Sequence, residues 1–388
     1  MKVWEPGLRD EAAIGLVRLL ARPAWAGSDT AAALRAALRK LADDPKPVVR
    51  AQASHGILLL DDDPGPAATV ISRVRERILR EQDPNVLSVQ LRQVAAVIPD
   101  ESSGELDQFL EELAGQPQGA FLQPGAPSGE PPEASPWTLR DEVAETVAEM
   151  LTRLAVVDGA PFSAGRLADW LSRPLRDANR TKMLLRHLQP YLNPPDGTGQ
   201  EATFTQLAAV VQAIRAAWPA AANPAAGGPT GGAAARDAAL IAHQLAQQLD
   251  RASGAHDHQS PATSAVPRGA DPVFAAYAIP MLCDLGAVQH PQVTQPVIQA
   301  LINLSQVSPA GALQAVAQTV PASGPYVTDP FAASTVCAYL TRLLAEHRDL
   351  VLGTDAGLTA FRYLLEAFAG AGDPAALALV YGFAEAFR

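Results

Sequence analysis

The feature that most constrains the fold of this chain is a turn motif that recurs before apolar segments. Its clearest copy is Asp44-Pro45-Lys46-Pro47-Val48-Val49-Arg50-Ala51-Gln52-Ala53, and the next is Asp83-Pro84-Asn85-Val86-Leu87. Further copies begin at His290-Pro291 and Asp373-Pro374. The aspartate can accept hydrogen bonds from backbone N–H groups at a helix start, and the proline lacks the N–H that would be unsatisfied there. A turn of this kind that returns after about 40 residues is typical of stacked helix pairs.

The composition favours helices along the whole chain. Apolar residues make up 48% of the 388 residues and aromatic residues only 5%, and the apolar set is dominated by the strong helix formers Ala and Leu. Residues that favour strands, such as Ile, Tyr and Phe, are sparse. The 33 prolines and 28 glycines lie more between the periodic segments than within them. We therefore predict an all-α protein.

The segment 65–81 shows why these helices must pack on one another. Val70, Ile71, Val74 and Ile78 share one face of the predicted helix, whereas charged residues occupy the opposite face. One helix cannot bury such a stripe alone, and each neighbour that covers it contributes about 25 cal/mol per Å² of apolar surface. We predict antiparallel helices at about 7–21, 28–42, 46–60, 65–81, 84–98, 100–114, 137–157, 164–172, 178–190, 201–218, 237–252, 271–286, 291–306, 309–319, 329–347, 355–369 and 373–387.

Composition also divides the chain into regions. Two stretches rich in Pro, Gly or Ala separate three helical regions. The first of these stretches predicts a linker or surface loop, and the second predicts a flexible loop. The regions are helical repeats at 1–115, a Pro-rich linker at 116–136, a central helical region at 137–218, a Gly/Ala/Pro-rich flexible loop at 219–236, and C-terminal repeats at 237–388 with a loop at 253–270.

The repeated motif resembles that of the HEAT-repeat family, whose members pair two helices around an Asp/Pro–x–Val–Arg pattern. The matching positions are Asp44, Val48, Val49, Arg50 and Ala53, then Asp83, Val86, Leu87 and Leu91, then Pro291, Val293, Ile298 and Leu301. The second and third copies lack the arginine. The resemblance implies antiparallel helix pairs stacked into a HEAT/armadillo-like α-solenoid, interrupted by Pro/Gly-rich loops. It also implies an extended surface that binds proteins, peptides or sometimes nucleic acid.

Charge and targeting signals restrict the classes of partner. The net charge is −11, which disfavours broad binding to phosphate backbones. The first residues lack the apolar core of a signal peptide, and no apolar run reaches the length of a membrane span. We expect a cytoplasmic protein with no membrane association. The bias towards Ala, Pro, Gly and Arg is typical of a GC-rich bacterial genome.

Motifs that carry chemistry are missing from the sequence. It contains no phosphate-binding Gly-x-x-x-x-Gly-Lys-Ser/Thr, no Gly-x-Ser-x-Gly elbow and no His-Glu-x-x-His. Cys283 and Cys337 are expected to be small core residues. His256-Asp257-His258 has two imidazoles beside a carboxylate, and it is either a solvated loop or part of a metal site completed from elsewhere. We predict no enzyme activity, cofactor or resident metal.

Basic helix faces are the candidate binding surfaces. One contains Arg73, Arg77 and Arg80, and the other contains Arg176, Arg180 and Arg186 around Trp170; Arg50 of the first repeat motif is a further candidate. These residues are either contacts for an acidic partner or ordinary helix faces paired with neighbouring carboxylates such as Glu76 and Glu81. Within the second cluster, a guanidinium–indole contact or a groove would involve Trp170.

The leading functional hypothesis is a non-catalytic protein–protein interaction scaffold, or a regulatory subunit of a larger bacterial assembly. The alternative is a nucleic-acid-binding or repair protein that uses the basic faces around Arg73–Arg80 and Arg166–Arg186. In fold class the chain resembles the HEAT-like alkylpurine DNA glycosylases, which use a tryptophan and an aspartate near the lesion. Trp170 and Asp169 offer the closest composition here, without a motif match.

Overall fold

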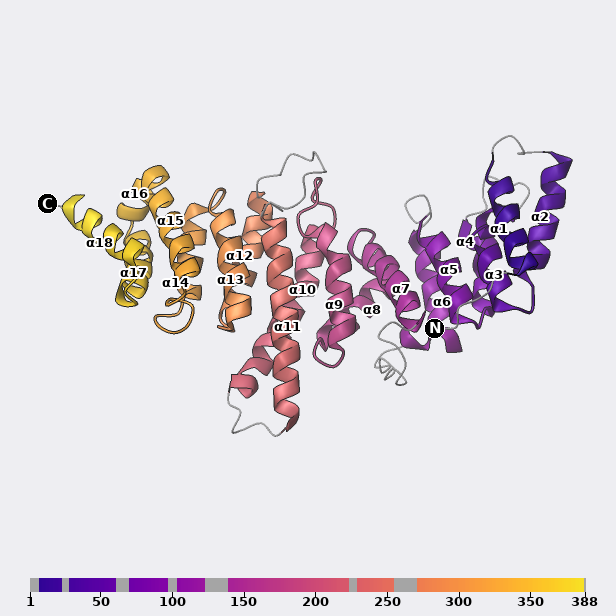
Figure 1. Ribbon diagram of the computed structural model, residues 1–388, viewed down its shortest axis with the longest axis horizontal. Coiled ribbons are helices and arrows are strands. Elements are labelled where there is room, and N and C mark those ends of the chain that lie inside the picture. The colour runs from indigo at the N-terminus through magenta and orange to yellow at the C-terminus, as the bar shows by residue number, and fades with distance from the viewer. Residues whose placement is uncertain are drawn as a thin grey trace. The chain divides into compact units, whose positions relative to one another are not determined.

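The computed structural model describes residues 7–22, 28–60, 70–96, 103–122, 139–222, 229–254 and 271–386. Within these ranges every regular element is helical: eighteen α-helices and three 3₁₀ segments (Figure 1). The predicted all-α class is therefore confirmed. In the same ranges, no helix is both long enough and apolar enough to cross a membrane.

Internal contacts divide the chain into two compact units, Met1–Asp169 and Trp170–Arg388. The boundary lies within helix α8 (Pro161–Ser172), inside the predicted central region 137–218. Most residues of the predicted loops at 116–136 and 253–270 lie outside the described ranges; the described ones include a 3₁₀ segment at Pro117–Leu122 and a turn at 253–254, directly after Ala252.

The first unit consists of helices that pack on their second neighbours as well as on the next helix. Helices α1, α3, α5 and α7 each contact the following member of this series, α2 contacts α1 and α3, and α4 contacts α5 and α6. The bounds are α1 Leu8–Leu20, α2 Asp29–Ala42, α3 Pro47–Ser54, α4 Val70–Arg80, α5 Pro84–Ala95, α6 Ser103–Ala114 and α7 Leu139–Val156.

Helix α4 has the amphipathic arrangement predicted for it. Ile71, Val74 and Ile78 are almost fully buried, whereas Glu76 and Arg80 are exposed. The apolar stripe thus faces the neighbouring helices, and its burial stabilises their packing.

Helix α3 ends earlier than predicted. The helix predicted for 46–60 stops at Ser54, and a 3₁₀ turn follows at Ile57–Leu59. Between them the chain passes close to its neighbours at Gly56, where a Cβ atom would come within 2.7 Å of the Val17 side chain and 3.0 Å of the Leu38 side chain.

The second unit continues with helices from α9 onward, and Figure 1 shows them side by side with mostly short connections. Helices α9, α11 and α13 pack in series, as do α10, α12, α14 and α17, and α18 packs on α15 and α17. The bounds are α9 Ala178–Leu188, α10 Gln200–Ala222, α11 Pro229–Ala252, α12 Pro272–Gly286, α13 Pro291–Leu304, α14 Pro309–Thr319, α15 Pro330–Glu346, α16 Arg348–Leu352, α17 Asp355–Gly370 and α18 Pro374–Ala386, with a 3₁₀ turn at Gln189–Tyr191.

The break predicted at 219–236 is shorter in the structure. Helix α10 runs on to Ala222 and α11 already begins at Pro229. Both extensions contain runs of alanine, the strongest helix former, and this preference outweighs the glycines at 231 and 232.

Asp-Pro turns start several helices, as the sequence predicts. The Asp83 carboxylate accepts hydrogen bonds from the backbone N–H groups of Asn85 at 3.0 Å and Val86 at 3.3 Å. Asp373 caps α18 in the same way. At α3 the geometry differs, because Asp44 accepts from the N–H of Lys46 at 2.8 Å and Pro47 is the first helical residue. His290 makes no side-chain cap at α13.

Candidate functional site

Arg50, predicted to bind a partner, forms an internal ion pair with Glu81. Its Nε donates to Glu81 Oε2 at 3.0 Å and its Nη2 donates to Oε1 at 2.9 Å. Nη1 donates to the backbone carbonyls of Asp44 at 3.0 Å and Pro45 at 3.2 Å. The hydrogen bonds with Glu81 raise the pKa of Arg50. The guanidinium therefore connects the turns before α3 and α5, and its part in partner binding stays a prediction.

The arginines of α4 also have carboxylate partners from other helices. Arg75 forms a two-pronged ion pair with Glu112 of α6. Arg77 Nη1 lies 2.6 Å from Asp43 Oδ1, just after α2. These contacts join helices within the first unit, so both guanidinium groups have a structural role.

Arg80 and Arg73 differ from these two. Arg80 pairs with Glu76 one turn earlier on α4, and both side chains are about three-quarters exposed. The backbone of Arg73 is part of α4, but its side chain lies outside the described residues. The binding role predicted for this face is untested.

The second basic cluster contains the predicted guanidinium–indole contact. The Arg180 guanidinium carbon lies 4.9 Å from the centre of the Trp170 ring, and Arg180 Nε lies 3.3 Å from Asp177 Oδ2. Trp170 is buried, so its ring is a packing surface for Arg180. Arg176 and Arg186 are exposed, and each has a partner within the chain.

The histidine-rich metal-site candidate and the two cysteines are the remaining groups that the sequence singles out. The His256-Asp257-His258 sequence lies outside the described residues. Within the described ranges, no group of three or more His, Cys, Asp or Glu side chains is placed to hold a metal ion. Cys283 and Cys337 form no disulfide; Cys337 is buried as expected, whereas Cys283 is only half-buried.

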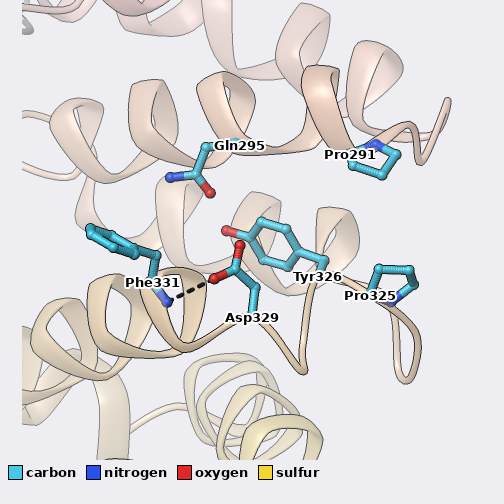
Figure 2. A pocket seen from close by; sticks show the side chains of 6 residues that line it. All are labelled: Pro291, Gln295, Pro325, Tyr326, Asp329 and Phe331. Atoms are coloured by element: carbon cyan, nitrogen blue, oxygen red, sulfur yellow. Dashed lines mark hydrogen bonds between the residues drawn. The ribbon is translucent and has the colours of Figure 1, made fainter.

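A pocket that the sequence reading missed lies in the second unit between α13 and the start of α15. Its volume is about 410 Å³. Figure 2 shows six lining residues around one space, with Pro291 and Gln295 from α13 facing the others; the lining residues are Pro291, Gln295, Pro325, Tyr326, Asp329 and Phe331.

The polar groups of this pocket are arranged around Asp329. One oxygen of its carboxylate, Oδ1, accepts the N–H of Phe331 at 2.8 Å and so caps α15. Tyr326 is only 7% exposed, and its hydroxyl has no hydrogen-bond partner within the described part of the chain. Burial, and secondarily the Asp329 charge, raise the pKa of Tyr326, so the phenol is neutral at physiological pH. Phe331, in contrast, is 82% exposed.

A sequence signal for this pocket does exist. Asp329-Pro330 repeats the Asp-Pro turn found at residues 83 and 373, and the residue that follows is an aromatic one. The same turn occurs at Asp271-Pro272, where Asp271 accepts the N–H of Val273 at 2.9 Å. The motif predicts the helix start but not the lining residues, which come from separate segments.

Comparison with known proteins provides no relative from which a role for these residues could be transferred. Neither a protein-family model, nor a curated protein, nor a solved structure matches this chain.

Proposed function

We propose that this chain is a HEAT-like helical-repeat protein that binds other proteins and is not an enzyme. The α-solenoid architecture is supported by the packing order within each unit. In the first unit α1, α3, α5 and α7 contact one another in series, and in the second α9, α11 and α13 do so beside α10, α12 and α14. Contacts between each helix and its second neighbour are those expected when helix pairs stack.

The observation that carries the binding function is the surface of α18. This helix contains almost no charged residues, and Ala376 is buried on the side that packs on α15 and α17. Tyr381 is 71% exposed, and Leu377 and Val380 are each 37% exposed. Clustered exposed apolar side chains on one helix are typical of a protein-binding surface.

A protein partner fits the charges better than a nucleic acid does. Arg50, Arg75 and Arg77, which would have to contact phosphates, are paired with carboxylates inside the first unit. Binding a phosphate backbone would break these pairs, and the net charge of −11 would oppose the approach of the polyanion.

The test is affinity capture with the full chain from cells that produce it naturally, followed by mass spectrometry. We expect the wild type to retain a saturable protein partner. A Leu377→Lys, Tyr381→Lys double variant should lose that partner, because two charges would be buried in the interface. Glu366→Lys, on the exposed side of α17, is the control for added positive charge.

The helical content of each variant is checked by circular dichroism. If the wild type retains no protein, or if the α18 double variant retains the partner as well as the wild type does, the proposed function is wrong. Retention of nucleic acid in a salt-dependent manner would favour the alternative.

A further inference from the structure

The pocket at the start of α15 contains the one Asp, Glu, Lys or Arg side chain of a long stretch of the sequence, Asp329. Between Leu285 and Thr341 the sequence has no Asp, Glu, Lys or Arg other than Asp329. From Asp271 to the last residue there are nine acidic and four basic side chains. A positively charged group approaching the pocket therefore meets a negative potential and no competing cation from this stretch.

Only one carboxylate oxygen of Asp329 has a structural role. Its Oδ1 caps α15, and the side chain is exposed. No ion pair to Asp329 is found within the described residues. A carboxylate offers about four lone-pair positions, so Oδ2 is available to a ligand.

The other side chains add an aromatic surface and polar groups next to this carboxylate. The Phe331 ring is mostly exposed, although an aromatic side chain gains by burial. Gln295, also exposed, presents an amide from α13. Figure 2 shows the Tyr326 hydroxyl directed towards the space between Gln295 and Asp329. That hydroxyl is buried without a partner in the described chain, an arrangement that is unfavourable unless a ligand or water satisfies it.

We propose that this pocket binds an arginine side chain of the partner protein, an inference that rests on the proposed protein-binding function. The guanidinium donates to Asp329 Oδ2, and its flat face lies on the Phe331 ring. The Gln295 amide oxygen and the Tyr326 hydroxyl oxygen accept its remaining N–H groups. Pro291 and Pro325 form apolar walls against the methylene stem.

Arginine fits this set of groups better than lysine does. A guanidinium has five N–H donors in one plane and stacks on aromatic rings, whereas an ammonium is a compact, strongly hydrated charge. The acceptors of the pocket are spread over three side chains and lie beside a ring, which matches a planar donor with several N–H groups.

The binding test uses the full chain and three blocked pentapeptides that are identical except at the centre. The central residue is arginine, lysine or citrulline, which has nearly the shape of arginine but no charge, and the flanking residues are glycine. Binding is followed by NMR through selectively labelled Phe and Tyr rings, and the Phe331→Ala variant identifies the Phe331 signal. We expect the arginine peptide to bind with a dissociation constant of about 1 mM, as one side chain would, and to shift the Phe331 and Tyr326 signals.

Two matched variants test the role of the charge. Asp329→Asn keeps the oxygen that caps α15, because Asn is as good an N-cap as Asp, but it removes the charge; we expect arginine binding to weaken about tenfold. Asp271→Asn makes the same change at the equivalent cap of α12, which does not line the pocket, and should leave the affinity unchanged.

The inference is overturned if citrulline and arginine peptides bind equally, if neither shifts the Phe331 signal, or if Asp329→Asn binds arginine like the wild type. Affinity capture of the partner by these variants distinguishes failure of the arginine-pocket proposal from failure of the proposed function. A partner that is lost with the α18 variant but held equally by Asp329→Asn and Phe331→Ala would refute the arginine pocket and leave the scaffold function standing. Specific binding of the arginine peptide without any captured protein would refute the scaffold function and leave the arginine-binding pocket standing.

Discussion

In the first unit, charged side chains connect segments that are far apart in the sequence, whereas residues 285–341 of the second unit contain a single charged side chain. Asp107 of α6 accepts three hydrogen bonds at the start of α8, and Arg50 connects two turns through Glu81. The corresponding helices α12–α15 pack mainly through aliphatic and aromatic residues such as Phe274 and Leu301.

This difference changes how the charges of each unit are interpreted. In the first unit, clustered arginines mark internal ion pairs, so a basic cluster in the sequence is poor evidence for a binding surface. In the second unit, neither Asp329 nor Asp250 forms an ion pair within the described residues, although Arg251 follows Asp250 directly, so the environments of these two carboxylates are informative.

Replacing Asp107 by alanine should destabilise the start of α8 by about 3 kcal/mol, because a hydrogen bond to a charged acceptor contributes about 1.5–3 kcal/mol and the contributions of three bonds to one carboxylate are not additive. Its carboxylate accepts the N–H of Phe162 at 2.9 Å, the N–H of Ser163 at 2.8 Å and the Ser163 hydroxyl at 2.6 Å. Hydrogen exchange at the Phe162 and Ser163 amides should accelerate about a hundredfold.

Ser163→Ala is the matched control, since it removes the hydroxyl bond alone and should cost about 1 kcal/mol. Exchange at these amides that is unchanged in Asp107→Ala would show that the carboxylate does not hold α8.

Replacing Arg50 by alanine should destabilise the first unit by about 2 kcal/mol, because Glu81 would remain almost buried without its partner. Urea unfolding followed by circular dichroism measures this loss. In the double variant Arg50→Ala, Glu81→Gln, part of the stability should return, since the buried carboxylate is no longer charged. Strictly additive losses would mean that the pair is not coupled.

Most of the helices could be predicted from the sequence, because their signals are local. The apolar stripe of α4 and the Asp-Pro starts of α5 and α18 depend on residues within one or two turns. The close packing of Gly56 against Val17 and Leu38, just after the early end of α3, could not be predicted, since it joins residues from different segments. The start of α11 could not be predicted, because the glycines at 231 and 232 favour a break whereas the neighbouring alanines favour a helix.

The candidate site could be predicted only in part. The position of Trp170 within the second basic cluster predicts either a guanidinium–indole contact or a groove, and the structure shows the contact, with Arg180. The pairing of Arg75 with Glu112 and of Arg77 with Asp43 joins residues from different helices, and no local pattern reports such distances. The pocket of Asp329 was missed for the same reason, because Gln295 and Phe331 approach each other only through helix packing.

Replacing Asp250 by asparagine should stabilise the second unit at neutral pH, in contrast to the losses expected in the first. Burial raises the pKa of Asp250 from 3.8 to about 6, against the attraction of Arg251. The folded state therefore holds the proton more tightly than the unfolded state, and stability falls as the pH rises from about 4 to about 6. The full shift would correspond to about 3 kcal/mol, but the side chain is partly exposed and screened, so we expect a gain of about 1 kcal/mol.

Asparagine keeps an oxygen that can accept the hydrogen bond of Asn303 Nδ2, now 3.1 Å from Asp250 Oδ1. The gain should appear in thermal unfolding at pH 7 and disappear at pH 4, where the native aspartate is protonated in the folded state. Glu366→Gln, at an exposed position of α17, should have almost no effect at pH 7. A gain for Asp250→Asn that is equally large at pH 4 would contradict the assigned cause.

The smallest effect is expected for Arg80→Ala. Arg80 and Glu76 are about three-quarters exposed and lie one turn apart on α4, and such pairs contribute about 0.3–0.5 kcal/mol. Alanine recovers part of this through its higher helix propensity, so the free energy of unfolding measured in urea should change by less than about 0.5 kcal/mol.

Arg77→Ala is the matched comparison on the same helix, because Arg77 is less exposed and pairs with Asp43 of a different segment. Its loss should be about 1 kcal/mol. Equal losses for the two variants would mean that pairing across segments adds nothing in the first unit, and the contrast with the second unit would then rest on burial alone.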